Sequence, residues 1–186
     1  MNLISRVLQL TAVLILCIPV VVAADQTDQR LDVLFQTLQG SQDVDELIEV
    51  EASIWEIWYQ SGVTEIDVMM VEAGELVRVG ELEMAEAIYA SIIEQAPTFS
   101  EGWNRRATVR FYQHDYDGSL ADIEQTLKLE PRHFGAFWGL GMILGLQQDY
   151  QRAISAFEKL LEIKPNSRDA RPNIELLKQE LARQSV

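Results

Sequence analysis

The feature that most constrains this chain is a repeat, because Pro97, Pro131 and Pro165 recur with a 34-residue period. The segment before each proline has the same layout, with large and small residues in fixed columns. A fixed period of this length is typical of proteins that stack one supersecondary unit on the next. Because proline cannot continue a helix, we expect each of these prolines to end the second helix of its unit.

Each column keeps one size of side chain from unit to unit. Large side chains recur at Met69, Trp103 and Phe137, at Leu82, Tyr116 and Tyr150, and at Tyr89, Ile123 and Phe157. Small side chains recur at Ala73, Ala107 and Gly141, and at Ala85, Ser119 and Ala153. The spacing predicts two helices per unit, whose small residues let the backbones approach closely. One unit cannot bury its apolar face alone, so the expected fold is an all-α solenoid with a shared core.

The period and its columns resemble the tetratricopeptide repeat family. The resemblance runs from Ile66 to Pro165, over half of the chain, and predicts repeats at residues 66–99, 100–133 and 134–167. A helical hairpin at residues 25–65 and a capping helix at residues 168–186 are expected to flank the repeats. A hydrophobic content of 48% is enough for one packed domain of ordinary size.

The expected hairpin does not follow the register of the repeats, because its turn comes too early in the unit. Asp43 and Glu46 have the spacing of an N-cap residue and its reciprocal partner at the start of a helix. We interpret the hairpin as a cap on the exposed face of the first repeat, since terminal solenoid units are usually atypical. The alternative is a separate partner-binding surface built on Trp55, Trp58 and Tyr59.

The first 24 residues are predicted to be a cleaved signal peptide. Arg6 is followed by an apolar run from Val7 to Val22 and by small residues that end at Ala24. A periplasmic or secreted bacterial protein is therefore expected, and an uncleaved membrane anchor is the alternative, although the run is short for a span. Cys17 follows Leu16, which does not fit a lipoprotein site. Cleavage would leave the mature chain without cysteine and hence without a disulfide.

Charge is distributed unevenly along the chain, which has 29 acidic and 15 basic residues. Residues 25–97 contain 17 acidic and two basic side chains, whereas residues 98–186 contain 12 of each. This pattern indicates an acidic face that would steer a basic partner or repel an anionic membrane, or else ordinary solvation of helix faces. Nucleic-acid binding is disfavoured because no basic stripe offsets the acidic field.

The sequence contains no pattern that indicates catalysis, and neither a cofactor nor a metal is expected. His114 and His133 lack ligand-like spacing, and both are predicted to be surface residues, one in a turn and one just after Pro131. Gly139 and Gly141 lack the preceding strand and the Lys-Ser/Thr ending of a phosphate-binding loop, so we place them in a helix.

The family resemblance implies that the first helices of the repeats line a concave groove that holds a segment of a partner. The groove residues that it implies are Met70, Asn104, Arg105, Thr108, Phe111, Tyr112, Trp138 and Met142. The alternative for each of them is a packing role in a short, tightly wound solenoid. The family's chaperone-binding members clamp a carboxylate with lysine and asparagine, but Arg105 alone is basic among the corresponding positions here, which argues against that mode.

We therefore expect a non-enzymatic interaction module of the bacterial periplasm or cell envelope: an adaptor, scaffold or assembly factor that binds another protein or peptide. An accessory subunit of an envelope enzyme and a self-associating structural protein are the alternatives. Neither nucleic-acid binding nor membrane insertion after cleavage is expected, and a homo-oligomer is compatible with the sequence. A partly buried ion pair between Glu72 and Arg106 of adjacent repeats is also predicted, because both replace a large apolar residue in one column.

Overall fold

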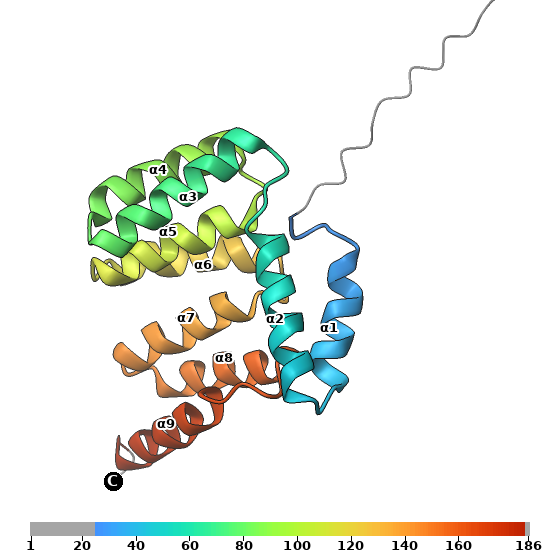
Figure 1. Ribbon diagram of the computed structural model, residues 1–186. Coiled ribbons are helices and arrows are strands. Elements are labelled where there is room, and N and C mark those ends of the chain that lie inside the picture. Colours follow the sequence, from blue (N-terminus) through green and yellow to red (C-terminus); the bar gives the residue numbers. More distant parts are fainter. Residues whose placement is uncertain (1–24, 185–186) are drawn as a thin grey trace, which may run out of the picture.

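The computed structural model describes residues 25–184, and all the regular structure within that range is helical (Figure 1). The N-terminal hairpin consists of α1 (Arg30–Gly40) and α2 (Val44–Trp58). Three helix pairs follow: α3 (Thr64–Val79) with α4 (Leu82–Gln95), α5 (Ser100–Tyr112) with α6 (Tyr116–Leu129), and α7 (Phe134–Leu146) with α8 (Tyr150–Ile163). The last helix, α9 (Ala170–Gln184), packs on α8. The predicted all-α solenoid is confirmed, while the predicted signal peptide with Cys17 lies outside the described residues.

None of the helices between residues 25 and 184 has the length and apolar character needed to cross a membrane. The helix ends follow the repeat, because α4, α6 and α8 each end just before the proline that closes their unit. A left-handed residue follows the first helix of each pair within two residues of its end, and these three residues occupy the same position in successive repeats. They are Gly80, His114 and Gln148, with φ of 85°, 64° and 61°.

The core of each pair is formed by the predicted packing columns. A Cβ atom added at Gly141 would lie 2.7 Å from the Phe157 ring, so the small residue is needed for α7 to approach α8. Ala73, Ala85, Tyr89, Ala107, Ile123, Ala153 and Phe157 are buried as well. Trp103, Tyr116, Tyr150 and Pro165 are half-buried, whereas Pro97 and Pro131 are exposed in the turns.

The hairpin does not cap the first repeat, and that interpretation is wrong. α1 and α2 run across the ends of the helices of the later repeats (Figure 1), and Leu31 and Ile54 share one core with Phe134 of α7 and Phe157 of α8. The physical reason is the composition of α7, which is apolar on all sides and therefore requires cover on more than the two faces that α6 and α8 provide.

Polar contacts hold the hairpin at both of its ends. Near its start, Gln26 donates through Nε2 to the Thr98 carbonyl at 2.6 Å and accepts through Oε1 from the Ser100 backbone N–H at 3.1 Å. Near the end of α8, the Lys164 ammonium lies 2.5 Å from the Glu51 carboxylate. The hairpin thus spans from the start of α5 to the end of α8.

The predicted ion pair between Glu72 and Arg106 is not formed. Arg106 instead makes a two-bond contact with Asp122 of its own repeat, with Nε–Oδ2 at 2.8 Å and Nη2–Oδ1 at 2.7 Å. Glu72 lies exposed on the outer side of α3. The guanidinium finds a buried carboxylate on α6, directly beside its own helix, and this nearer partner outcompetes one on an adjacent repeat.

Candidate binding groove

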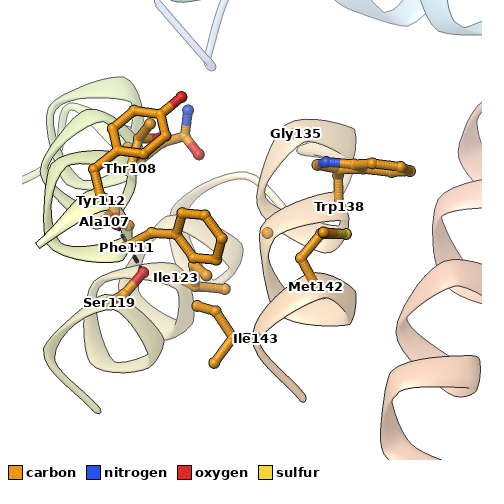
Figure 2. Close-up of a pocket in the computed structure, with 12 residues that line it drawn as sticks. Ala107, Thr108, Phe111, Tyr112, Ser119, Ile123, Gly135, Trp138, Met142 and Ile143 are labelled. Carbon is orange, nitrogen blue, oxygen red and sulfur yellow. Dashed lines mark hydrogen bonds between the residues drawn. The ribbon is translucent and has the colours of Figure 1, made fainter. Parts of the chain in front are cut away.

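A hollow of about 180 Å³ opens between α5 and α7 and has α6 as its floor (Figure 2). Its walls and floor are formed by Asn104, Ala107, Thr108, Phe111, Tyr112, Ser119, Ile123, Gly135, Trp138, Gly139, Met142 and Ile143. Most of these side chains are apolar, and the polar groups are few. A concave apolar surface with a small number of polar groups is typical of a binding site in proteins.

The α5 wall places its side chains one helical turn apart. Asn104, Thr108 and Tyr112 follow each other at every fourth position and therefore share one side of the helix. Tyr112 has 53% of its surface exposed, and the Phe111 ring points into the gap between the helices (Figure 2). This wall therefore presents an exposed aromatic edge at one end of the hollow and amide and hydroxyl groups toward the other.

The α7 wall carries Trp138 and Met142 one turn apart (Figure 2). Trp138 is half-buried, because its ring meets Phe157 edge-on at a centroid distance of 5.2 Å. The floor is fixed by a hydrogen bond of 2.7 Å that the Ser119 hydroxyl donates to the Ala107 carbonyl. Trp138 therefore serves both as a wall of the hollow and as part of the core.

Two of the eight predicted groove residues lie outside this hollow. Met70 is 3% exposed and packs in the core of the first repeat with Tyr89 and Phe99, so its assignment to the groove is wrong. The equivalent residues of α5 and α7 are Asn104 and Trp138, which line the hollow, whereas Met70 is covered by the side chains of its own repeat. The other residue is Arg105.

Arg105 is engaged by the hairpin rather than lining the hollow. Its guanidinium lies 4.3 Å from the centroid of the Tyr59 ring and 5.7 Å from that of Trp55, within the range of cation–π contacts. Its Nε donates to Glu101 at 2.5 Å. Burial lowers the pKa of Arg105 to about 10, which leaves it charged at neutral pH. Its charge is therefore already paired within the chain.

A buried polar cluster that the sequence did not indicate lies behind Arg105. Glu101 is fully buried and accepts hydrogen bonds from Asn104 Nδ2 at 3.0 Å and from His133 Nε2 at 2.9 Å, besides the bond from Arg105. Burial raises the pKa of Glu101, and the hydrogen bonds from His133 and Asn104 act in the opposite direction. The cluster links the starts of α5 and α7, where the hairpin covers both.

The prediction that His133 is a surface residue is wrong, because it is 0% exposed. Its Nδ1 accepts a bond from the Ala136 backbone N–H at 3.1 Å, so Nε2 carries the proton that is donated to Glu101. Trp58 of α2 covers its ring. No repeat column marks this pair, because it depends on where the hairpin packs. His114, by contrast, is exposed in a turn, where its Nδ1 lies 3.0 Å from the Tyr116 hydroxyl.

The alternative surface built on the aromatic residues of α2 is also corrected by the structure. Trp58 is 0% exposed, Trp55 is half-buried, and a Cβ atom added at Gly135 would lie 2.8 Å from the Trp55 ring. Tyr59 alone remains exposed, at 38%. These residues attach the hairpin to the repeats because large aromatic rings bury the most apolar area per residue.

Within residues 25–184, no three histidine, cysteine, aspartate or glutamate side chains lie together in a group that could hold a metal ion. The charged side chains at the starts of α5 and α7 are instead engaged with one another, as the bonds of Glu101 with Arg105 and His133 illustrate.

Comparison with known proteins identifies the architecture. Residues 104–168 match the profile of the Tetratricopeptide repeat family. A TPR repeat-containing protein of Rhizobium etli is 34% identical over 160 residues, which covers 86% of this chain and 78% of that protein. The chain belongs to the tetratricopeptide repeat family.

Solved tetratricopeptide repeat structures share the fold at lower sequence identity. The first TPR of Spaghetti (RPAP3), bound to an HSP90 peptide, superimposes with a TM-score of 0.62 at 19% identity, covering 64% of this chain and 94% of that one. The Sgt2 TPR domain of Aspergillus fumigatus gives 0.62 at 22% identity, with 66% and 83% covered. The TPR2B domain of yeast Sti1, in complex with pHsp70, gives 0.60 at 16% identity, with 63% and 99% covered.

Proposed function

We propose that this tetratricopeptide repeat protein is a non-enzymatic interaction module that holds a segment of a partner protein in the hollow between α5 and α7. One observation carries the proposal: an open, mostly apolar hollow lies between the first helices of two successive repeats, with the half-exposed Tyr112 ring at its edge. Six of the eight groove residues expected from the sequence line it.

The size and chemistry of the hollow define the segment that it fits. A volume of about 180 Å³ accommodates one large apolar side chain of the partner, such as leucine or phenylalanine. At the rim, the Asn104 amide nitrogen is occupied by Glu101, which leaves its amide oxygen as an acceptor. The Thr108 hydroxyl donates to the Asn104 carbonyl at 3.0 Å and can still accept a bond. The rim therefore favours backbone N–H groups of a bound segment.

Relatives of the same fold support peptide binding as the class of function. The RPAP3 domain and the Sti1 domain were both solved in complex with chaperone-derived partners. A carboxylate clamp is not proposed here, because Arg105 is paired with Glu101 and covered by Tyr59. The recognition that we propose instead rests on an apolar anchor residue.

The test uses Tyr112→Ala, because this side chain is exposed and its loss leaves the core intact. We expect the variant to keep its unfolding midpoint and to bind the partner more weakly by about 1 kcal/mol or more. The matched control is Leu176→Ala on α9, where the side chain is 55% exposed and far from the hollow in sequence. The partner is identified by cross-linking from position 112 in the native host; equal partner recovery by wild type and Tyr112→Ala would refute the groove.

We also propose that the protein acts in the bacterial periplasm or is secreted. The support is the pattern of residues 1–24, with one basic residue before an apolar run and small residues at its end. An intact mass of the protein from its host tests this proposal. A mature chain that begins near Asp25 is the expected result, and retention of Met1 in a membrane fraction contradicts it.

A further inference from the structure

The outer side of α3 is exposed, whereas the equivalent surface is buried in the first helices of the other two repeats, α5 and α7. In α5, Gly102 packs on the preceding unit, and a Cβ atom added there would lie 3.1 Å from Ile92 of α4. In α7, the equivalent Ala136 is 1% exposed. The same position in α3, one repeat before Gly102, is Val68, which is 60% exposed. α3 therefore presents a face that in α5 and α7 receives a helix of the unit before it.

A second position of this face shows the same difference. Val109 of α5 and Ile143 of α7 are both 0% exposed, whereas their equivalent in α3 is the exposed Glu75. Val71, one turn after Val68, is 70% exposed. Within the described chain the segment that precedes α3 is the hairpin, and it packs on α7 and α8 instead. The face is thus shaped for a helix, and its apolar residues remain in solvent.

We infer that this face of α3, defined here by Val68 and Val71 with Glu65 and Glu72 beside them, docks an amphipathic helix of another protein that carries lysine or arginine along its apolar stripe. The inference concerns a surface separate from the hollow between α5 and α7. The register of the repeats argues for a helical occupant, because a helix fills the same position on α5 and on α7.

The charge of the first repeat argues for a basic occupant. Residues 64–97 contain eight acidic side chains and one basic side chain, Arg78, which is already paired with Glu75 at 2.7 Å. Glu65 and Glu72 are exposed, and neither makes an ion pair with any residue in the range 25–184. Apolar side chains bordered by uncompensated carboxylates favour a partner with positive charge beside its apolar contacts.

A second copy of this chain fits the face poorly. Pairing α3 with α3 of another copy would bring Glu65 and Glu72 close to identical carboxylates, and such like-charge contacts are costly. At the opposite end of the repeats, α9 exposes a single large apolar side chain, Leu176, among its described residues. A face with two adjacent exposed valines therefore has no matching apolar stripe at that end of the described chain.

The test measures binding of a labelled synthetic helix to the full-length protein by fluorescence anisotropy. The probe has about 16 residues, the length of α3, with leucines on one side and lysines beside them. Its control replaces every lysine by glutamate. We expect the lysine helix to bind with roughly micromolar affinity and to weaken as salt rises, and the glutamate helix to bind at least about tenfold more weakly.

Two sets of surface variants locate the binding. Val68→Ser together with Val71→Ser, and separately Glu65→Gln together with Glu72→Gln, should each weaken the lysine helix by about tenfold without changing the unfolding midpoint. The matched controls are Val33→Ser on α1, where the valine is 65% exposed, and Glu158→Gln on α8; both should bind as wild type does. Tyr112→Ala should also bind the helix as wild type does. Binding at α3 can therefore be distinguished from binding in the hollow between α5 and α7.

Four outcomes would overturn the inference. They are equal binding of both helices, no binding of the lysine helix, unchanged binding by the Val68 and Val71 variant, or loss of binding in the controls. Dimers in sedimentation equilibrium that the Val68 and Val71 variant abolishes would assign the face to a second copy instead. A photo-cross-link from position 71 to residues 1–24 of the full chain would assign it to the chain's own N-terminus.

Discussion

The ring of His133 lies face to face with the indole of Trp58, with a centroid distance of 4.1 Å and an angle of 10° between the rings. Trp58 belongs to the N-terminal hairpin, and His133 is the N-cap residue of α7, where the second repeat meets the third. The stack is fully buried, and it joins two segments that the repeat pattern treats as unrelated. The attachment of the hairpin should therefore depend on Trp58.

Truncation of Trp58 should destabilise the whole fold. Trp58→Ala is expected to lower the free energy of unfolding by about 3–5 kcal/mol, as other large-to-small changes of buried aromatic residues do. Tyr59→Ala is the control, because this ring is 38% exposed and its loss should cost much less. Urea denaturation followed by far-UV circular dichroism measures both. Equal midpoints for the two variants would show that the hairpin is not held by Trp58.

Replacement of Trp58 by phenylalanine should be much less destabilising than replacement by alanine. Trp58 Nε1 is buried without a hydrogen-bond partner among residues 25–184. Trp58→Phe removes this unsatisfied donor, and that gain offsets part of the lost packing. We therefore expect Trp58→Phe to cost less than half of what Trp58→Ala costs in the same urea titration. A phenylalanine variant as unstable as the alanine variant would mean that the indole N–H is satisfied in solution.

The ion pair between Arg106 and Asp122 should show strong coupling in a double-mutant cycle. Asp122 is 1% exposed, and Arg110 Nη1 also donates to its Oδ2 at 3.0 Å. Removal of Arg106 therefore leaves this buried carboxylate with one of its two guanidinium partners and should cost about 1.5–3 kcal/mol. Arg106→Met with Asp122→Leu should cost less than the sum of the two single changes. The parallel cycle of Arg106→Met with Glu72→Gln should be additive, since Glu72 is exposed and not bonded to Arg106. Additivity in the first cycle would contradict the pair.

The burial of Glu101 predicts a pH dependence of stability. Burial raises the pKa of Glu101 above its ordinary value of 4.5, so the folded protein holds this proton more tightly than the unfolded chain does. Stability from this group is therefore present at low pH and is lost as pH rises from 4.5 through the raised pKa. Wild type should lose stability relative to Glu101→Gln over that range. Chemical denaturation at a series of pH values measures the difference, and parallel curves would contradict it.

Replacement by alanine should change the stability of the protein in opposite directions at two glycines that lie inside helices. Gly141→Ala places a Cβ atom 2.7 Å from the Phe157 ring and should destabilise the protein by about 1–3 kcal/mol. Gly74 in α3 has nothing within 4 Å of such an atom, so Gly74→Ala should stabilise by about 0.5–1 kcal/mol through backbone entropy. Thermal melts of both variants test this prediction. Melting temperatures that shift in the same direction for both variants would be inconsistent with this packing.

The repeated part of the fold could be predicted because the same pattern of packing residues occurs in each of the three repeats. The requirement for a small residue at Gly141 beside Phe157 follows from columns that recur in every unit. The walls of the hollow follow for the same reason, since Thr108 and Met142 occupy one position in successive first helices. Local spacing fixes the direction of these side chains, and the repeat then sets one helix beside the next.

The contacts outside the register could not be predicted in this way. The position of the hairpin depends on Trp58 meeting His133, which lies two repeats further along the chain, and a single sequence gives no signal for such a pair. The burial of Glu101 and the pairing of Arg105 with Tyr59 follow from that placement. The assignment of Met70 to the groove fails because its side chain packs against Tyr89 and Phe99 in the core of the first repeat, whereas Asn104 and Trp138 at the equivalent positions line the hollow.

The hairpin has a mechanical consequence for the molecule. A simple solenoid behaves like a spring, because each repeat contacts only its neighbours and the ends can fray independently. Here the hairpin is a brace: Gln26, just before it, bonds to Ser100 at the start of α5, and Glu51 within it pairs with Lys164 at the end of α8. The second and third repeats therefore form a closed frame, and we expect its opening between α5 and α7 to keep a nearly constant width. The pair α3–α4 lies outside this frame and joins it through the packing of α4 on α5, so we expect it to move more freely than the two braced pairs.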